Sequence, residues 1–298
     1  IETDDEGNVF VTGRTHSTNF PTADAGTYFE GASSVGADVF IIKFNNDGVR
    51  LWCTYYAGDH NDRSYSMVID PSGNVYLAGY TRSSDFPLLD SGGFFYDEDI
   101  VQSSGFILKF DNEGERLWAT KVGGGGLDYI TGITLDDEGN LFACGSTGSL
   151  DFHVVGGGYS QTSLADYRDG FLMKFDADQE LVWSTYYGGD INDDFFDVAT
   201  DSDGNLFVVG TTISSDFPVY DAGTFFQGVK ENYGVSIFLK FDNDGNRLWS
   251  TLFGGTPEPY SFEDYVYCCV VDHKDNFVVL GTTESHDLPV LDAGTYFK

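Results

Sequence analysis

Short apolar runs alternate with polar turns along the whole chain, and none of the runs is long enough for a helix. The clearest example has four consecutive runs at residues 194–201, 205–212, 235–242 and 246–253. Valine, isoleucine, phenylalanine, tyrosine and threonine dominate them, which favours β-strands. Tight Asp- and Asn-containing turns join the first run to the second and the third to the fourth. The pattern therefore predicts a hairpin, a long loop and a second hairpin.

This pattern repeats. The turn of the first hairpin occurs five times, and its asparagine recurs at intervals of 66, 66, 65 and 71 residues, the last lengthened by the insertion TPEPY at 256–260. A second motif, with a KF pair followed by a turn and LW or VW, occurs four times and uses every tryptophan, namely Trp52, Trp118, Trp183 and Trp249. Four strands in a unit of about 66 residues are too many for one coil of a β-solenoid, so the period predicts a β-propeller.

The repeat covers the chain from end to end, which predicts one all-β propeller array over residues 1–298, with four complete four-stranded blades plus a half repeat. The expected blade units are approximately 1–52, 53–118, 119–183, 184–249 and, as a partial unit, 250–298. Five first hairpins face only four second hairpins, so an unpaired blade edge is expected, and such edges favour self-association. The ends at Ile1 and Lys298 are interpreted as those of a fragment or a processed product.

The DxxGN turns look like metal loops, but their spacing argues otherwise. An EF-hand loop needs glycine at its sixth position and glutamate at its twelfth. In this chain threonine is twelfth in all five copies, and glycine is fourth in four of them, with Asp275 in its place in the fifth. A turn explains these residue types, because aspartate accepts backbone hydrogen bonds and glycine supplies a positive φ. The predicted structural turn residues are Asp4, Gly7, Asp70, Gly73, Asp136, Gly139, Asp201 and Gly204.

A better cation candidate is the acidic loop that follows the tryptophan strand. Several carboxylate and amide oxygens on a glycine-led loop suit calcium, the one cofactor that the sequence suggests. The alternative is a solvated acidic loop, and the third repeat offers only Asp128 at this place. The candidate ligands are Asp190, Asn192, Asp193 and Asp194 in one repeat and Asp59, Asn61 and Asp62 in another.

The charge balance narrows the choice of partners. With 48 acidic and 15 basic residues, the net charge is −33, so nucleic acid and anionic lipid are excluded as expected partners. No apolar run approaches the roughly 20 residues that span a bilayer. Aromatic residues make up 16% of the chain, which predicts a sizeable core.

Buried positions are expected for two further sets of residues. The cysteines lack metal-type spacing and lie in apolar runs, so buried free thiols are expected at Cys53, Cys144, Cys268 and Cys269. The alternative is a strained disulfide between the adjacent Cys268 and Cys269. A lysine recurs in an apolar strand at Lys43, Lys109, Lys174 and Lys240. A buried lysine needs a partner, and the expected one is an aspartate of the S-x-D-F-P loop, such as Asp85, Asp151 or Asp216.

The stretch WSTYYGGDINDDFFDVATDSDGNLFVVGTTISSDFP, residues 183–218, resembles the SBBP family, the β-propeller repeat named for a seven-bladed propeller. The resemblance rests on the chained elements W-x-T-Y-x-G-G, D-x-x-G-N and S-x-D-F-P and extends over essentially the whole chain. The third repeat departs from it, because WATKVGGGG replaces WSTYYGG and His153 replaces the proline. The resemblance implies an extracellular or cell-surface location and supplies no catalytic residues.

The resulting prediction is a non-catalytic extracellular propeller that serves as a scaffold, adhesion or self-assembly module, with copies of itself or other surface proteins as partners. An enzyme is not expected, because hydrolase, zinc-protease and phosphate-loop motifs are missing and the five histidines lie on different loops. The alternative is a ligand-binding module that holds a glycan on loop aromatics, namely Tyr28, Phe29, Phe225, Phe226, Tyr296 and Phe297.

Overall fold

The computed structural model describes residues 1–23, 36–89, 103–165, 167–223, 225–228, 234–255 and 264–289. In these ranges the protein is all-β, and no helix is long and apolar enough to cross a membrane. The strands are β1 (Glu2–Thr3), β2 (Val9–Thr15), β3 (Asp38–Phe44), β4 (Arg50–Tyr56), β5 (Asp62–Ile69), β6 (Val75–Thr81), β7 (Ser104–Phe110), β8 (Arg116–Val122), β9 (Asp128–Leu135), β10 (Leu141–Thr147), β11 (Asp169–Phe175), β12 (Leu181–Tyr187), β13 (Asp193–Thr200), β14 (Leu206–Thr212), β15 (Val235–Phe241), β16 (Arg247–Phe253), β17 (Tyr265–Val271) and β18 (Phe277–Thr282).

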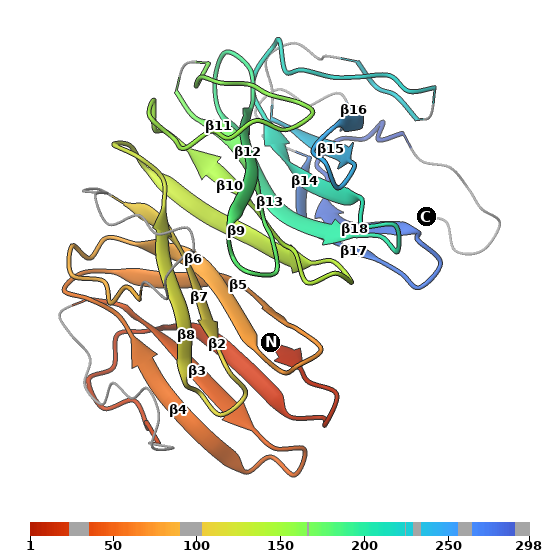
Figure 1. Cartoon of the computed structure of the whole chain (residues 1–298). Coiled ribbons are helices and arrows are strands. Elements are labelled where there is room, and N and C mark those ends of the chain that lie inside the picture. Colours follow the sequence, from red (N-terminus) through yellow and green to blue (C-terminus); the bar gives the residue numbers. More distant parts are fainter. Residues whose placement is uncertain are drawn as a thin grey trace.

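These strands form one antiparallel sheet after another, each in chain order (Figure 1). Blade 1 contains β1 to β4, blade 2 β5 to β8, blade 3 β9 to β12 and blade 4 β13 to β16, while blade 5 has only β17 and β18 within the described residues. The innermost, first strands of blades 2 to 5 contact one another in succession (β5, β9, β13 and β17). The predicted fold class, a propeller array of four-stranded blades with a partial fifth, is confirmed.

The DxxGN stretches are hairpin turns, as predicted. In the fourth copy, the backbone N–H of Gly204 donates to the Asp201 carbonyl at 3.0 Å, and Gly204 has a φ of 75°. The Asp201 carboxylate accepts the backbone N–H of Asn205 at 2.8 Å. In the fifth copy Asp275 replaces the glycine and still adopts a φ of 59°, a conformation that aspartate tolerates better than most residues.

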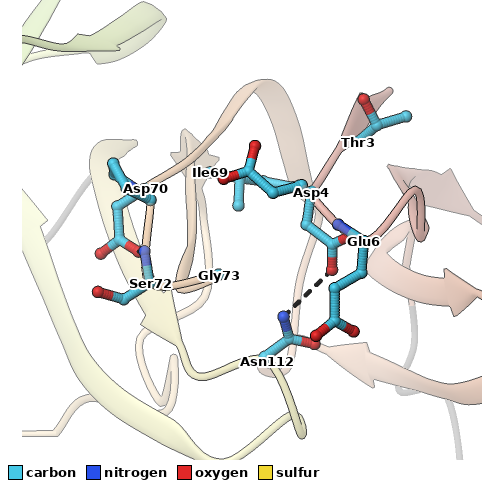
Figure 2. Close-up of a pocket in the computed structure, with 10 residues that line it drawn as sticks. Thr3, Asp4, Glu6, Ile69, Asp70, Ser72, Gly73 and Asn112 are labelled. Atoms are coloured by element: carbon cyan, nitrogen blue, oxygen red, sulfur yellow. Dashed lines mark hydrogen bonds between the residues drawn. The ribbon is translucent and has the colours of Figure 1, made fainter.

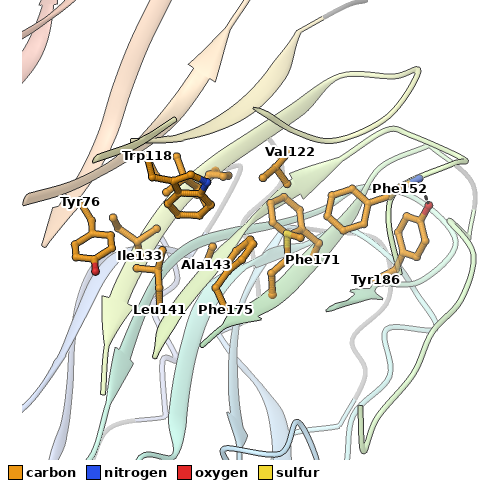
Figure 3. Packing of buried hydrophobic residues seen from close by; sticks show 14 of the residues in the cluster. Tyr76, Trp118, Val122, Ile133, Leu141, Ala143, Phe152, Phe171, Phe175 and Tyr186 are labelled. Atoms are coloured by element: carbon orange, nitrogen blue, oxygen red, sulfur yellow. Dashed lines mark hydrogen bonds between the residues drawn. The ribbon is translucent and has the colours of Figure 1, made fainter. Parts of the chain in front are cut away.

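Each blade has two apolar faces. We call the face that packs on the preceding blade its leading face and the face that packs on the following blade its trailing face. Figure 3 shows one such junction, where Tyr76 and Trp118 on the trailing face of blade 2 meet Leu141, Phe171 and Phe175 on the leading face of blade 3. All five side chains are at least 97% buried. Hydrophobic burial between blades, rather than within a single sheet, therefore forms the core.

Hydrogen bonds between neighbouring blades, which we call clasps, also connect some of these junctions. Between blades 1 and 2, the Lys43 ammonium donates to the Asn112 carbonyl at 3.0 Å, and the Trp52 indole N–H donates to the same oxygen at 3.3 Å. The Asn112 side chain returns a hydrogen bond to the Asp4 carboxylate at 3.2 Å. Lys174, Trp183, Asn243 and Asp136 repeat this arrangement between blades 3 and 4.

The expected pairing of the lysines with the S-x-D-F-P aspartates is therefore wrong. Lys43 and Lys174 bond to a turn asparagine of the next blade, and Lys240 pairs with Asp201 of a DxxGN turn at 2.8 Å. The lysine lies near the hairpin-turn end of its strand, so its ammonium group contacts turn residues instead. The S-x-D-F-P aspartates cap loop amides instead, as described below.

Candidate functional site: the inner pocket

The predicted calcium ligands have separate roles in the structure. Asp190 is exposed and forms two hydrogen bonds with the S-x-D-F-P loop. Its carboxylate accepts the Ser215 N–H at 3.1 Å, and its own N–H donates to the Asp216 carboxylate at 2.7 Å. Asp194 instead pairs with the Arg168 guanidinium at 2.6 Å. The Asn192 carbonyl accepts the Ile213 N–H at 3.1 Å. These groups thus satisfy loop amides and a neighbouring cation instead of converging on one point.

Asp62 and Asp193 are fully buried, and their surroundings are repeated in the other blades. The Asp193 carboxylate accepts hydrogen bonds from the Gly189 N–H at 2.6 Å and the Ser214 hydroxyl at 3.0 Å. In blade 2, Asp62 accepts the equivalent bonds from Gly58 and Ser83, both at 2.9 Å. This arrangement recurs blade after blade. We therefore interpret it as structural: the buried aspartate holds the loop that follows each tryptophan strand in place.

Among the described residues, no group of three or more histidine, cysteine, aspartate or glutamate side chains is positioned to hold a metal ion. In the second proposed loop, exposed Asp59 caps the Ser84 N–H at 3.2 Å, and the Asn61 side chain accepts the Ala37 N–H at 2.9 Å. The calcium site therefore stays a prediction with no support from these contacts.

An acidic cleft of about 300 Å³ lies between the first turns of blades 1 and 2 (Figure 2). Asp4 and Asp70 face it, but both carboxylates hold their own turns: each accepts the N–H and the side-chain amide of the asparagine four residues later. Asp4 also accepts the Asn112 amide across the cleft, the dashed contact in Figure 2. These hydrogen bonds explain the cleft as part of the turn and clasp structure.

A pair of buried carboxyl groups lies at the junction of blades 3 and 4. A Cβ atom on Gly188 would lie 2.6 Å from both Asp169 Oδ1 and Asp193 Oδ2, so the two carboxyl groups face each other across this glycine. Both side chains are completely buried, and the Oδ1 atom of each has no hydrogen-bond partner. Burial raises the pKa of Asp169 to about 7 and that of Asp193 to about 6.

This pair predicts a pH-dependent effect of Asp169→Asn. Because the pKa of Asp169 is raised in the folded state, its stabilising contribution is complete below about pH 4 and is lost as pH rises through about 7. We expect Asp169→Asn to gain unfolding free energy relative to the unmodified chain between pH 4.5 and 8, on the order of 2–4 kcal/mol. Chemical denaturation at both pH values measures this, with exposed Asp203→Asn as the control. A difference that does not change with pH would contradict the prediction.

The inner strands surround a pocket of about 560 Å³, which we call the inner pocket. Its volume lies within the range of small-molecule sites. The described residues that line it come from β5, β9, β13 and β17: Tyr65, Ser66, Thr131, Phe196, Asp197, Tyr265, Tyr267 and Cys268. No other cavity characterised in the described part of the chain draws its lining from four blades.

Aromatic rings dominate the inner pocket. Phe196 and Tyr265 lie with ring centroids 6.1 Å apart and planes 26° from parallel, and Tyr265 and Tyr267 follow at 6.5 Å and 6°. Tyr65, on the blade 2 side, carries the Arg63 guanidinium 4.5 Å above its ring. The pocket therefore presents ring faces and edges from three different blades.

Asp197 supplies the carboxylate of the inner pocket. Its Oδ1 accepts the Val198 N–H at 3.0 Å and its Oδ2 accepts the Cys269 N–H at 2.9 Å, so it holds a bulge in β13 against β17. Burial raises the pKa of Asp197 above its usual value. A positive charge in the pocket would offset this desolvation and favour the ionised carboxylate.

The inner pocket lies at positions where the repeats differ from one another. At the position that starts the first strand or immediately precedes it, four blades carry the same residue: Asp62, Asp128, Asp193 and Asp264. Three residues later the residues diverge to Tyr65, Thr131, Phe196 and Tyr267, and one further on to Ser66, Gly132, Asp197 and Cys268. The motifs that the repeats share do not reveal this pocket, because its lining lies at positions that the repeats do not share. The divergence itself is the signal that could have identified it.

Cys268 also corrects the prediction of four buried thiols. Cys53, Cys144 and Cys269 are buried, whereas Cys268 is exposed and lines the inner pocket, and all four are free. Burial raises the pKa of Cys53 to about 11 and the pKa values of Cys144 and Cys269 still further. Adjacent residues in a strand point to opposite faces, so Cys268 and Cys269 cannot both enter the core.

Only two of the six aromatic residues predicted to bind a glycan lie within the described residues. Tyr28, Phe29, Tyr296 and Phe297 lie outside the described residues. Phe225 and Phe226 are exposed, and the Phe225 ring lies 5.8 Å from that of Phe253 on β16. Glycan binding at these loops stays a prediction, as do the extracellular location and self-association.

Comparisons with known proteins give one repeat family and two distant relatives. A family profile described as SBBP, beta-propeller repeat, matches residues 1–21, 51–87, 117–153 and 182–218. An uncharacterized WD repeat-containing protein of Acanthamoeba polyphaga mimivirus is 22% identical over 95% of this chain and 24% of its own length. The regulatory protein FlaEY of Caulobacter vibrioides is 29% identical over 54% of this chain and 16% of its own length. The chain thus spans less than a quarter of either relative.

Among solved structures, a gluconolactonase of Xanthomonas campestris is similar at 14% identity and a TM-score of 0.39, over 82% of this chain and 65% of its own. This finding corrects the prediction of a non-catalytic extracellular scaffold or adhesion module, because the structural neighbour is an enzyme and neither curated relative is named as an adhesion protein. The exclusion of an enzyme is wrong for the same reason. The TM-score is too low to transfer an activity or a site to this chain.

Proposed function

Since the chain belongs to the SBBP family of β-propeller repeats, we propose that its blades serve as a frame for ligand binding, and that the inner pocket binds a small organic cation. The observation that carries this proposal is the combination of four aromatic rings and one carboxylate around a single pocket of about 560 Å³. Aromatic faces attract cations, and such cages recognise quaternary ammonium groups.

Charge supports a cation over an anion. The described lining residues include Asp197 and no lysine or arginine. The chain as a whole has a net charge of −33, which raises the local concentration of cations and repels anions. An anionic ligand would meet the Asp197 carboxylate and no positive side chain among these lining residues.

Neighbouring aromatic rings already hold cations within the protein itself. The Arg63 guanidinium lies 4.5 Å from the centroid of Tyr65, and that of Arg82 lies 5.9 Å from the centroid of Tyr80. Tyr80 is in turn 5.8 Å from Tyr65. Guanidinium groups therefore pack on this aromatic surface, and the rings of Tyr265 and Tyr267 offer the same chemistry to a ligand.

Choline and its neutral isostere 3,3-dimethylbutan-1-ol provide the test, because they share a shape and differ in charge. We expect calorimetry to detect choline binding and to find the neutral compound at least about tenfold weaker, as one cation–π contact with a desolvated charge contributes about 2 kcal/mol. Bound choline should also slow the reaction of Cys268 with a thiol reagent. Equal binding of the two compounds, or no binding of either, would disprove the proposal.

Variants locate the binding. Tyr267→Leu and Asp197→Asn are expected to weaken choline binding about tenfold each, because they remove a ring and a charge from the pocket. Tyr167→Leu is the matched control, since Tyr167 is 69% exposed and lies outside the pocket. A loss of affinity in the control as large as in Tyr267→Leu would show that choline binds elsewhere.

A further inference from the structure

Three arginines lie together beside the inner pocket, and we call Arg14, Arg63 and Arg82 the arginine cluster. The Arg63 guanidinium lies 4.5 Å from the ring centroid of Tyr65, which lines the pocket. The Arg82 guanidinium lies 5.9 Å from the centroid of Tyr80, whose ring is 5.8 Å from that of Tyr65. Burial raises the pKa of Tyr65, and the positive charges of Arg63 and Arg14 oppose this rise because both lie near it. The cluster therefore adjoins the pocket at Tyr65.

The arginine cluster has no acidic partner in the described part of the chain. None of its three members forms an ion pair there, although the chain has 48 acidic and only 15 basic residues. Arg168 shows the contrasting arrangement, because its guanidinium pairs with the Asp194 carboxylate at 2.6 Å. Blades 1 and 3 pack on the two sides of blade 2, so the cluster has both of its neighbouring blades. Guanidinium groups gathered without carboxylates keep hydrogen-bond donors available for the anionic group of a ligand.

The charges near the inner pocket differ from blade to blade. At the repeat position of Arg63, blade 4 carries Asp194, and the same blade supplies the Asp197 carboxylate to the pocket. Blade 3 lies between these two blades, because β9 contacts both β5 and β13. The other blades carry no arginine or lysine at the repeat position of Arg82, where they have His16, Gly148, Ile213 and Glu284. The pocket thus has positive groups beside blade 2 and a carboxylate on blade 4.

We propose that the ligand of the inner pocket is a zwitterion, a phosphocholine diester whose quaternary ammonium group lies on the pocket aromatics near Asp197 and whose phosphate binds the arginine cluster. This inference rests on the cation binding proposed above and adds the anionic end of the ligand. Guanidinium groups bind phosphate oxygens through paired, charge-assisted hydrogen bonds.

The geometry and the charge of the protein both fit such a ligand. Because Arg63 lies over the ring of Tyr65, a molecule that extends from the pocket past this ring meets the arginine cluster. A phosphocholine diester has one positive and one negative charge. The net charge of −33 on the chain therefore does not repel it as it repels a simple anion.

Three soluble probes separate the two ends of the ligand. Glycerophosphocholine has both charges, choline has only the cation, and glycerol 3-phosphate has only the anion. We expect calorimetry to find that glycerophosphocholine binds at least about tenfold more tightly than either of the others, because it adds charge-assisted hydrogen bonds to the cation–π contacts. Vesicles of phosphatidylcholine identify the source of the group. Cosedimentation that glycerophosphocholine competes away would assign a lipid headgroup, and no cosedimentation would assign a soluble diester.

Variants of the arginine cluster test the phosphate contact. Arg63→Gln and Arg82→Gln are each expected to lower the ratio of the affinities for glycerophosphocholine and choline about tenfold. Arg50→Gln is the matched control and should leave the ratio unchanged, since Arg50 donates to the Pro21 carbonyl and does not line the pocket. Circular dichroism checks that each variant is folded, and Arg82→Gln, at an exposed position, still tests the contact if Arg63→Gln does not fold.

The outcomes distinguish this inference from the proposed function. If choline binds and glycerophosphocholine binds no more tightly, the pocket takes a simple cation and the zwitterion is excluded. A preference for glycerophosphocholine that persists in both cluster variants would exclude the arginine cluster as the phosphate site. If choline itself does not bind, the proposed function fails, and this inference fails with it.

Discussion

Replacement of Gly145 by alanine is expected to lower the free energy of unfolding by about 3 kcal/mol or more. Gly145 on β10 lies opposite a bulge in β9, where the strand register shifts. A Cβ atom on Gly145 would come within 1.9 Å of the Tyr129 carbonyl oxygen and 2.9 Å of the Phe171 ring. Because the first of these contacts is with backbone, the whole bulge would have to move. The shift of the chemical denaturation midpoint, at an unchanged slope, measures the loss.

Blade 1 provides a matched control for this substitution. Gly13 holds the same position in the repeat, but β1 is only two residues long and places no bulge opposite it. A Cβ atom on Gly13 would meet only the Phe40 ring, at 3.0 Å, and a half-buried side chain can shift by that much. Gly13→Ala should therefore cost less than half as much as Gly145→Ala. Equal losses would show that the bulge contact is not the cause.

Trp118→Ala is expected to destabilise the protein by about 3–5 kcal/mol, the usual loss for a fully buried aromatic side chain. Trp118 is completely buried between blades 2 and 3, and its ring meets that of Phe175 edge-on, 5.7 Å away. Removal of the indole opens a cavity in a junction that depends on packing between sheets. The loss is measured by chemical denaturation.

Trp249 is the natural comparison for Trp118. It occupies the same motif position in blade 4, yet it is only half-buried, because blade 5 contributes no second hairpin within the described residues. Trp249→Ala should therefore cost clearly less than Trp118→Ala. If both substitutions destabilise equally, the tryptophan acts mainly within its own blade and not through the junction.

Local chemistry accounts for what the sequence predicted well. The turn at Asp201 to Asn205 needs only a carboxylate acceptor and a glycine with positive φ, both of which are set by neighbouring residues. Contacts between distant residues account for the failures. Lys43 bonds to Asn112, 69 residues away, and no local pattern points to that partner. The neighbours Asp193 and Asp194 also looked alike, yet one is fully buried and the other pairs with Arg168.

The sequence by itself determined the hairpins, their turns and their period, because strand alternation and turn chemistry operate within a few residues. Only the tertiary structure decided which residues of those strands meet. It placed four diverged inner positions around one pocket and paired two carboxyl groups across Gly188. The physical reason is that these features depend on how one sheet packs on the next, and not on residues that are neighbours in the chain.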